Sequence, residues 1–142
     1  MKLYLARHGH SPLAFDDEAR VLSQRGVQQV TQVAELLVAQ GVKQLNIYHS
    51  GYQRAKQTAE IIAKQLGDVP AVTQLDGLQP DDDPNILQAH ADTWQQDSLI
   101  VSHLPYLQRS IATLLPNDYS ILFNPATIVC LERLNSKHWQ LR

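Results

Sequence analysis

Short apolar runs recur along the chain, and their length and β-branched content are typical of buried strands. In chain order, these runs are Lys2–Ala6, Leu45–Tyr48, Ala71–Leu75 and Ser98–Ser102. Near the end of the sequence, Thr127–Leu134 and His138–Leu141 flank the turn-forming stretch Asn135-Ser136-Lys137. This arrangement predicts a terminal hairpin.

Between the strands, apolar residues recur at every third or fourth position, which is the period of an amphipathic helix. The predicted helical segments run from Ser23 to Gly41, from Ala55 to Gly67, from Asn85 to Gln96 and from Pro105 to Pro116. Ser23 is a suitable N-cap, and a glycine just past the last apolar position is a common helix stop. The third segment has the weakest pattern of the four.

The regular alternation of strand and helix predicts the fold class. Such an order is typical of an α/β three-layer sandwich, with a mostly parallel central sheet and helices on both faces. With 142 residues, of which 44% are hydrophobic, the chain is long enough to bury a core of its own. We therefore expect a single domain over residues 1–142.

Charge and cysteine content exclude several classes of function. The 12 Lys and Arg are outnumbered by 14 Asp and Glu, so there is no overall positive charge to favour nucleic acid binding. One cysteine cannot form an internal disulfide, which fits a reducing compartment. The first apolar run, Met1–Leu5, is too short for a signal peptide or a membrane span. We expect a cytoplasmic protein without a membrane partner.

Cationic and imidazole side chains follow several of the predicted strands. Arg7 and His8 follow the first strand, the segment His49–Arg54 follows the second, and His103 follows the strand Ser98–Ser102. One such residue after a strand is usually a surface residue. Because the carboxyl ends of parallel strands meet at one edge of the sheet, these three segments together predict a site in the crevice beyond that edge.

The motifs around these residues resemble those of a known family. They are Arg7-His8-Gly9, Leu22–Gly26, Ser50–Ala59 and Val101–Pro105, and they occur in the order typical of the histidine phosphatase, or phosphoglycerate mutase-like, superfamily. The Arg-His-Gly triplet alone is a weak signal, whereas the later motifs in the same order are specific. The short chain without large insertions is most similar to the SixA-type phosphohistidine phosphatases. The resemblance implies hydrolysis of a phosphohistidine on a partner protein.

The resemblance also implies a role for each residue of the predicted site. His8 would be the nucleophile and would be phosphorylated transiently, while Arg7, Arg54 and His103 would bind the phosphoryl oxygens. Gly9 would allow the backbone to approach the phosphate, or would simply form a tight turn. Neighbouring arginines should lower the pKa of His8 and so favour its nucleophilic form. Their fixed charges could stabilise the transferring phosphoryl group with no metal or cofactor.

The sequence departs from the family pattern at several positions, and two of these departures bear on the chemistry. His10 stands where an acidic or amide residue is common, and it could contact phosphate, support the site or lie exposed in the loop. Near Gly77 many members carry a glutamate that protonates the leaving oxygen, and this chain has none there. Imidazole leaves more readily than an alkoxide, so the missing acid favours a phosphohistidine substrate. The candidates for a substitute acid are Asp76, Asp81, Asp82 and Asp83, although an acidic run before a proline is also typical of a solvated loop and a helix cap.

Three alternatives remain open from the sequence. His8 and His10 could bind zinc together with His49 and His103, although two arginines in the same crevice oppose a divalent cation. The protein could be a small-molecule phosphomonoesterase that uses one of the aspartates as its acid. It could also be a phosphate-dependent binding module without turnover.

Overall fold

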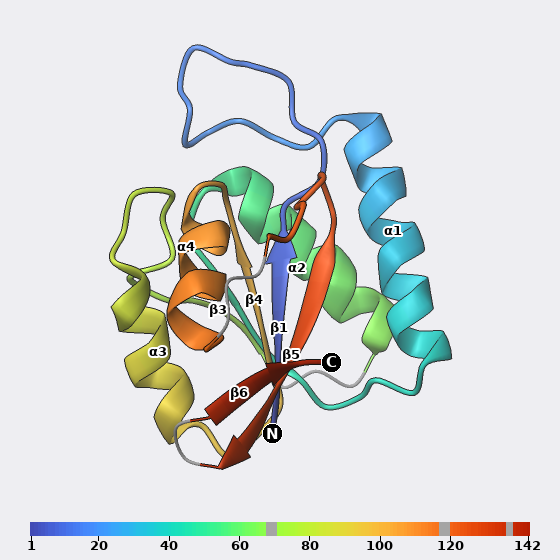
Figure 1. Ribbon diagram of the computed structural model, residues 1–142. Coiled ribbons are helices and arrows are strands. Elements are labelled where there is room, and N and C mark those ends of the chain that lie inside the picture. Colours follow the sequence, from blue (N-terminus) through green and yellow to red (C-terminus); the bar gives the residue numbers. More distant parts are fainter. Residues whose placement is uncertain (68–70, 117–119, 136–137) are drawn as a thin grey trace.

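The computed structural model describes residues 1–67, 71–116, 120–135 and 138–142. Within these ranges, a six-stranded sheet has the order β3-β2-β4-β1-β5-β6 (Figure 1). Its strands are β1 (Lys2–Arg7), β2 (Asn46–His49), β3 (Val72–Gln74), β4 (Ser98–Ser102), β5 (Ile128–Asn135) and β6 (His138–Leu141).

The sheet is mixed rather than mostly parallel. Strands β3, β2, β4 and β1 pair in parallel, as predicted, whereas β5 is antiparallel to both β1 and β6. The terminal hairpin accounts for the antiparallel pair of β5 and β6, because strands joined by a short turn run in opposite directions. Positions 136 and 137 of the predicted turn lie outside the described residues.

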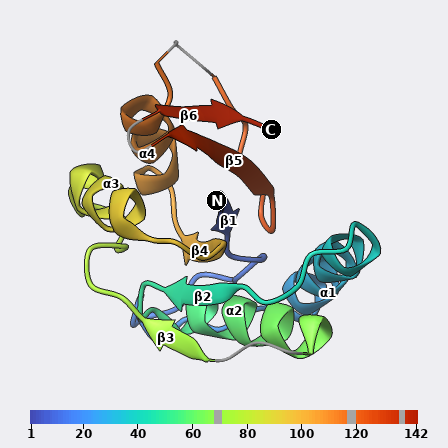
Figure 2. The ribbon, with the colours of Figure 1, turned by 90° about the horizontal axis from the view of Figure 1, so that it is seen from below.

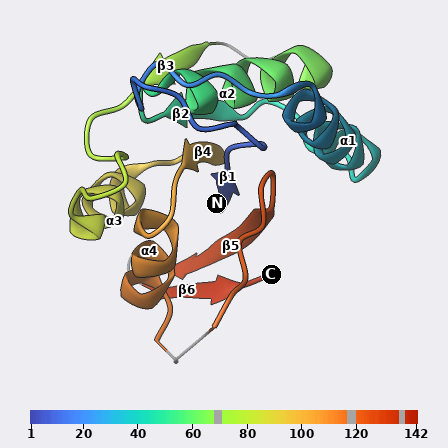
Figure 3. The ribbon, with the colours of Figure 1, turned by 90° about the horizontal axis from the view of Figure 1, so that it is seen from above.

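Helices cover both faces of the sheet, as the fold class requires. They are α1 (Gln24–Ala39), α2 (Gln53–Leu66), α3 (Pro84–Thr93) and α4 (Tyr106–Leu114). Figures 2 and 3 show α1 and α2 on one side of the sheet and α3 and α4 on the other. The three-layer α/β sandwich is thus confirmed. None of the helices described is long and apolar enough to cross a membrane.

The two faces of the sheet build two separate cores. In β1, Leu3 and Leu5 pack with the residues of α3 and α4, whereas Tyr4 and Ala6 pack with those of α1 and α2. This division results from the strand geometry, since successive side chains point to opposite faces. Strand β4 is buried along its whole length. The central strands β1 and β4 are therefore fixed from both sides, and the residues directly after each strand are positioned rigidly.

Candidate active site

The carboxyl ends of β1 and β4 bring two histidines together. His8 directly follows β1, and His103 directly follows β4. Because the two strands are neighbours, the rings lie side by side with their centroids 5.1 Å apart. Both side chains are buried, His8 with 7% of its surface exposed and His103 with 2%.

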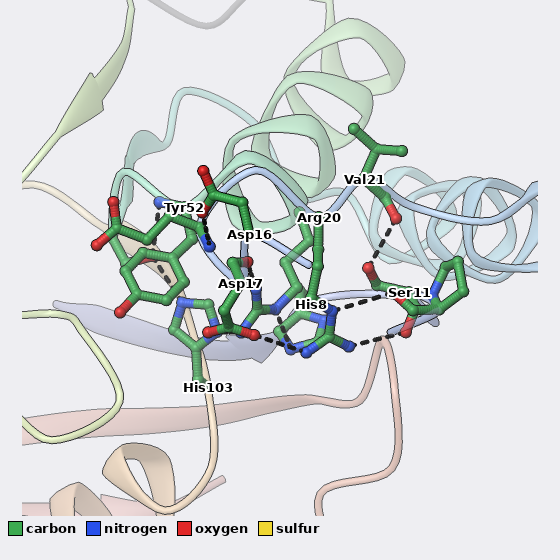
Figure 4. A network of polar contacts seen from close by, with 12 residues as sticks. His8, Ser11, Asp16, Asp17, Arg20, Val21, Tyr52 and His103 are labelled. Atoms are coloured by element: carbon green, nitrogen blue, oxygen red, sulfur yellow. Dashed lines mark hydrogen bonds and ion pairs between the residues drawn. The ribbon is translucent and has the colours of Figure 1, made fainter. Parts of the chain in front are cut away.

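Two arginines border the histidines. Arg54 lies in the first turn of α2, and its Nε is 3.4 Å from Nε2 of His8. Arg7 ends β1, and its Nη1 donates a hydrogen bond to the carbonyl of Phe123 at 2.8 Å. Among the residues described, the buried Nε of Arg7 has no hydrogen-bond partner. Residues predicted to form the site from three remote segments thus lie in one place (Figure 4).

The contacts of His8 define which nitrogen carries its proton. Nδ1 lies 2.7 Å from the carbonyl oxygen of Gly9, which can only accept, so Nδ1 is the donor. Nε2 faces the Nε–H of Arg54, and it is therefore the unprotonated nitrogen. This tautomer presents the lone pair that nucleophilic attack requires.

The surroundings of His8 keep the ring neutral. Burial is the largest cause, and the charges of Arg54 and Arg7 act in the same direction, whereas the bond to Gly9 acts against them; together they lower the pKa of His8 to about 4. The sequence predicted this direction and attributed it to the arginines. In the structure the larger part comes from burial, because a buried imidazolium loses its hydration.

His103 is also neutral in this site. Burial, followed by the proximity of His8 and Arg54, lowers its pKa to about 2. Its Nε2 lies 2.7 Å from the Ser50 hydroxyl, which itself accepts from the Tyr52 N–H and so has its proton free to donate. When Ser50 donates, the ring proton of His103 is on Nδ1, a buried atom without a partner among the described residues. His103 can therefore offer one N–H to an anion without being an imidazolium.

The chain matches the model of a known family. The family model of the histidine phosphatase superfamily (branch 1) matches residues 3–79, which is more than half of the chain. The chain belongs to the histidine phosphatase superfamily. It is a phosphatase with the α/β fold of that superfamily.

Individual relatives agree with this assignment. The phosphohistidine phosphatase SixA of Escherichia coli (strain K12) is 27% identical over 133 residues, which cover 90% of this chain and 83% of the relative. The solved structure of the protein histidine phosphatase SixA complexed with tungstate matches with a TM-score of 0.94 at 25% identity, covering 100% of this chain and 94% of that one. A phosphoserine phosphatase from Entamoeba histolytica, complexed with 3-phosphoglyceric acid, matches with a TM-score of 0.75 at 20% identity over 99% of this chain and 94% of its own. The last similarity supports the fold alone.

In this member of the superfamily, Gly9 is required by packing. Its N–H donates to Oγ1 of Thr58, so it points into the protein. A Cβ at Gly9 would lie 2.8 Å from the carbonyl oxygen of Gly26 and 2.8 Å from a methyl group of Val30. The contact with helix α1 therefore gives a physical reason for glycine here that was not foreseen from the sequence.

His10 and His49 are directed to other partners. Nδ1 of His10 lies 2.7 Å from the Ser23 hydroxyl, and this hydroxyl also caps α1 by accepting from the Gly26 N–H. Nδ1 of His49 accepts from the N–H of Gly51. In the part of the chain that the structure describes, no group of three or more His, Cys, Asp or Glu side chains could hold a metal ion. His10 thus supports the start of α1, and the zinc alternative has no ligand set among these residues.

In the segment that replaces the family's glutamate, a side chain at position 77 would be strained. Gly77 has a φ of +95°, and a Cβ there would lie 2.5 Å from Cγ2 of Ile86. Two of the candidate acids have structural partners: Asp82 accepts from the N–H of Gln79, and Asp83 caps α3 by accepting from that of Asn85. The capping predicted for the acidic run is confirmed at Asp83.

Four further residues shape the site and were not singled out from the sequence. Ser50 orients His103, and Thr58 bridges the Gly9 N–H and the carbonyl of Arg54. Both lie within the motif Ser50–Ala59, so a signal for them was present. Asp17 and Arg20 belong to the loop between β1 and α1, where they form an ion pair of 2.9 Å. Nothing in the hydrophobic pattern of that loop indicates its contacts with the site.

Proposed function

We propose that this protein is a phosphohistidine phosphatase that removes phosphate from a histidine on a partner protein through a phospho-His8 intermediate. The observation that carries the proposal is the state of His8: a neutral ring whose unprotonated Nε2 lies beside the Arg54 guanidinium. A nucleophile without a proton, next to a donor for phosphoryl oxygens, is the arrangement that phosphoryl transfer to histidine needs.

The reaction has two steps. Nε2 of His8 attacks phosphorus, the bond from phosphorus to the substrate nitrogen breaks, and the substrate imidazole leaves with its electron pair. Water then attacks the phospho-His8, which releases inorganic phosphate and restores the free ring. Arg7, Arg54 and the Nδ1–H of His103 bind the equatorial oxygens, where negative charge is spread in the transition state. The Nδ1–H bond to the Gly9 carbonyl keeps the His8 ring oriented in both steps.

The absence of a proton donor at position 77 supports the choice of substrate. An alkoxide needs a proton as it leaves, whereas imidazole has a pKa of about 6.5 and leaves readily once its second nitrogen is protonated. With a glycine at position 77, where a positive φ disfavours any side chain, a phosphoramidate suits this site better than an alkyl ester. The similarity to SixA points to the same class of substrate.

The charges of the site make a metal unnecessary for the proposed reaction. Arg7 and Arg54 supply fixed positive charge at the position where a metal would otherwise neutralise the phosphoryl group. We expect activity to be unchanged by EDTA. Activity that EDTA removes and zinc restores would contradict this part of the proposal.

The proposal is tested by the ratio of two catalytic efficiencies. We expect kcat/KM on a phosphohistidine-bearing protein to exceed that on an alkyl phosphate by several orders of magnitude. Replacing Asp81, Asp82 and Asp83 together with Asn should leave turnover of phosphohistidine nearly unchanged, since Asn retains most capping ability.

The opposite outcome would favour the main alternative, a small-molecule phosphomonoesterase. The fold is compatible with this alternative, since a phosphoserine phosphatase has a similar structure. If the unmodified protein prefers the alkyl ester, and Asp76→Asn or the triple variant selectively abolishes that activity, an aspartate is the general acid. The substrate would then not be phosphohistidine.

A further inference from the structure

Within the loop from Ser11 to Val21, Asp17 contacts Arg54 directly, and the charge of Arg20 also acts on His8. The backbone carbonyl of Asp17 accepts a hydrogen bond of 2.7 Å from Nη1 of Arg54, and its Oδ2 lies 3.5 Å from Nη2 of the same guanidinium. The other carboxylate oxygen, Oδ1, pairs with Nη1 of Arg20 at 2.9 Å. Figure 4 shows the Asp17 carboxylate close to the rings of His8 and His103. An anion belonging to the protein thus stands beside the proposed phosphoryl position.

The two edges of the Arg54 guanidinium are used differently. Nη1 makes a short bond to a neutral carbonyl, and this bond fixes the plane of the group. The Nε and Nη2 edge makes only long contacts, 3.4 Å to Nε2 of His8 and 3.5 Å to Oδ2 of Asp17. This edge can bind two phosphoryl oxygens side by side. A phosphoryl group on Nε2 of His8 would lie against this edge of Arg54, and it would also lie close to the Asp17 carboxylate.

The loop can keep its shape while the carboxylate moves. Nε and Nη2 of Arg20 donate to the carbonyls of Pro12 and Ser11, so Arg20 holds the loop through backbone atoms. The Asp17 side chain is 60% exposed, and it is free to turn toward solvent. The hydrogen bond from Arg20 is the main reason that the pKa of Asp17 is lowered, and the side chain is therefore anionic at neutral pH.

We propose that Asp17 determines specificity: its carboxylate competes with the phosphoryl group for Arg54 and repels ligands that carry a second anionic group beside their phosphoryl group. The proposal rests on the proposed function for the position of the phosphoryl group. It adds a selection by charge, because a phosphorylated imidazole brings no further anion to the pocket, whereas phosphoserine brings its own carboxylate. Two like charges at this distance repel each other even where water screens them.

The test measures binding by calorimetric titration of the full chain. The variant is Asp17→Asn, which keeps the backbone carbonyl and an oxygen for Arg20 and removes only the charge. Asp16→Asn is the matched control: Asp16 is the adjacent exposed aspartate, its Oδ1 accepts from the Glu18 N–H, and the change removes the same charge. The probes are inorganic phosphate and the pair phosphoethanolamine and phosphoserine, which differ by one carboxylate.

We expect Asp17→Asn to tighten binding of inorganic phosphate by about two- to fivefold, the size of effect that an exposed charge pair produces. The substitution should also tighten the binding of phosphoserine more than that of phosphoethanolamine, so that the ratio of their dissociation constants moves toward one. Asp16→Asn should change neither quantity. If Asp17 merely held the loop in place, its substitution would weaken the binding of all three ligands together.

Unchanged or weaker phosphate binding in Asp17→Asn overturns the proposal, as does an unchanged ratio between the paired ligands. Binding is measured without turnover, so a failure to hydrolyse phosphohistidine would contradict the proposed function and leave this test intact. A native protein that binds no inorganic phosphate would overturn the role of Asp17 whatever its substrate proves to be.

Discussion

His8 is held by contacts at both nitrogens of its ring, and the two contacts act in different ways. The carbonyl of Gly9 orients the ring and retains its proton, while Arg54 faces the nitrogen that stays free. Orientation and activation are therefore separate properties of this residue.

The first prediction concerns loss of the His8 ring. His8→Ala should abolish turnover and prevent the phosphorylated enzyme from forming, because the proposed nucleophile is removed. The measurement is trapping of the phosphoenzyme by an alkaline denaturing quench, which preserves the phosphorus–nitrogen bond, together with thermal unfolding. His138→Ala, at an exposed histidine in β6, is the control and should retain both activity and phosphoenzyme. Phosphoenzyme in the His8 variant would assign the nucleophile to another residue.

The second prediction concerns the protonation of the same ring. Since burial is the main cause that lowers the pKa of His8 to about 4, its imidazole resonances should titrate well below the ordinary histidine value of about 6.5. NMR titration of the ligand-free protein measures this midpoint. A midpoint near 6.5 for His8 would mean that the ring is hydrated and that the burial described above is not maintained in solution.

At the scale of elements, the first turn of helix α1 lies against the segment after β1 at a glycine, Gly26. A Cβ at Gly26 would lie 2.1 Å from the carbonyl oxygen of His10, so the helix start and the segment after β1 touch through their backbones. Ser23 and His10 join the same two segments by a hydrogen bond. The helix thereby fixes the beginning of the loop that carries Asp17.

The third prediction tests this contact. Gly26→Ala should lower the free energy of unfolding by about 1–3 kcal/mol, because the added methyl group forces backbone apart, and this cost exceeds the gain in helix propensity of about 1 kcal/mol. Gln28→Ala, at an exposed position of the same helix, is the control and should change stability little. Denaturant unfolding of both variants measures the difference. Equal stability of Gly26→Ala and the parent would show that the helix shifts freely.

Elements with a strong period were predictable from the sequence, and the contacts of the loop that carries Asp17 were not. Helix α1 has buried residues at Val30, Ala34 and Leu37, a spacing that belongs to no other structure. The loop after β1 is shaped by donors of Arg20 and Arg54 that bind backbone carbonyls. A carbonyl is present at every residue, so such contacts leave no signature in residue type.

The same reasoning applies to the candidate site. The motifs predicted that His8, Arg7, Arg54 and His103 would converge, and the structure brings them together. The neutral state of His103 could not be predicted, because burial depends on the packing of the surrounding elements. Gly9 was interpreted from its own segment alone. The packing that requires a glycine there involves helix α1, which begins many residues later in the chain.

At the scale of the whole molecule, the buried histidines link stability to pH. His8 and His103 remain neutral in the folded protein, but in the unfolded chain each binds a proton near pH 6.5. The unfolded state therefore binds more protons as pH falls below 6.5, and the free energy of unfolding must decrease. Asp17, whose pKa is lowered from 3.8, acts in the same direction only below that value.

The fourth prediction is the pH dependence that this linkage requires. Between pH 7.5 and pH 5, at constant salt, the free energy of unfolding should fall, and His103→Asn should reduce the fall because one buried neutral imidazole is removed. Denaturant titrations at both pH values provide the measurement. Equal pH dependence in the parent and in His103→Asn would contradict the lowered pKa of His103.

The pairing of β1 with β4 has a consequence for how this fold diversifies. Neighbouring strands lie about 4.8 Å apart, and the rings that come directly after β1 and β4 have centroids 5.1 Å apart. The spacing of the two histidines is therefore the spacing of the sheet itself, measured out by backbone hydrogen bonds and independent of the length of chain between residues 8 and 103. Loops above the site can be lengthened, shortened or exchanged to suit a new substrate, while the distance between the two rings stays the same.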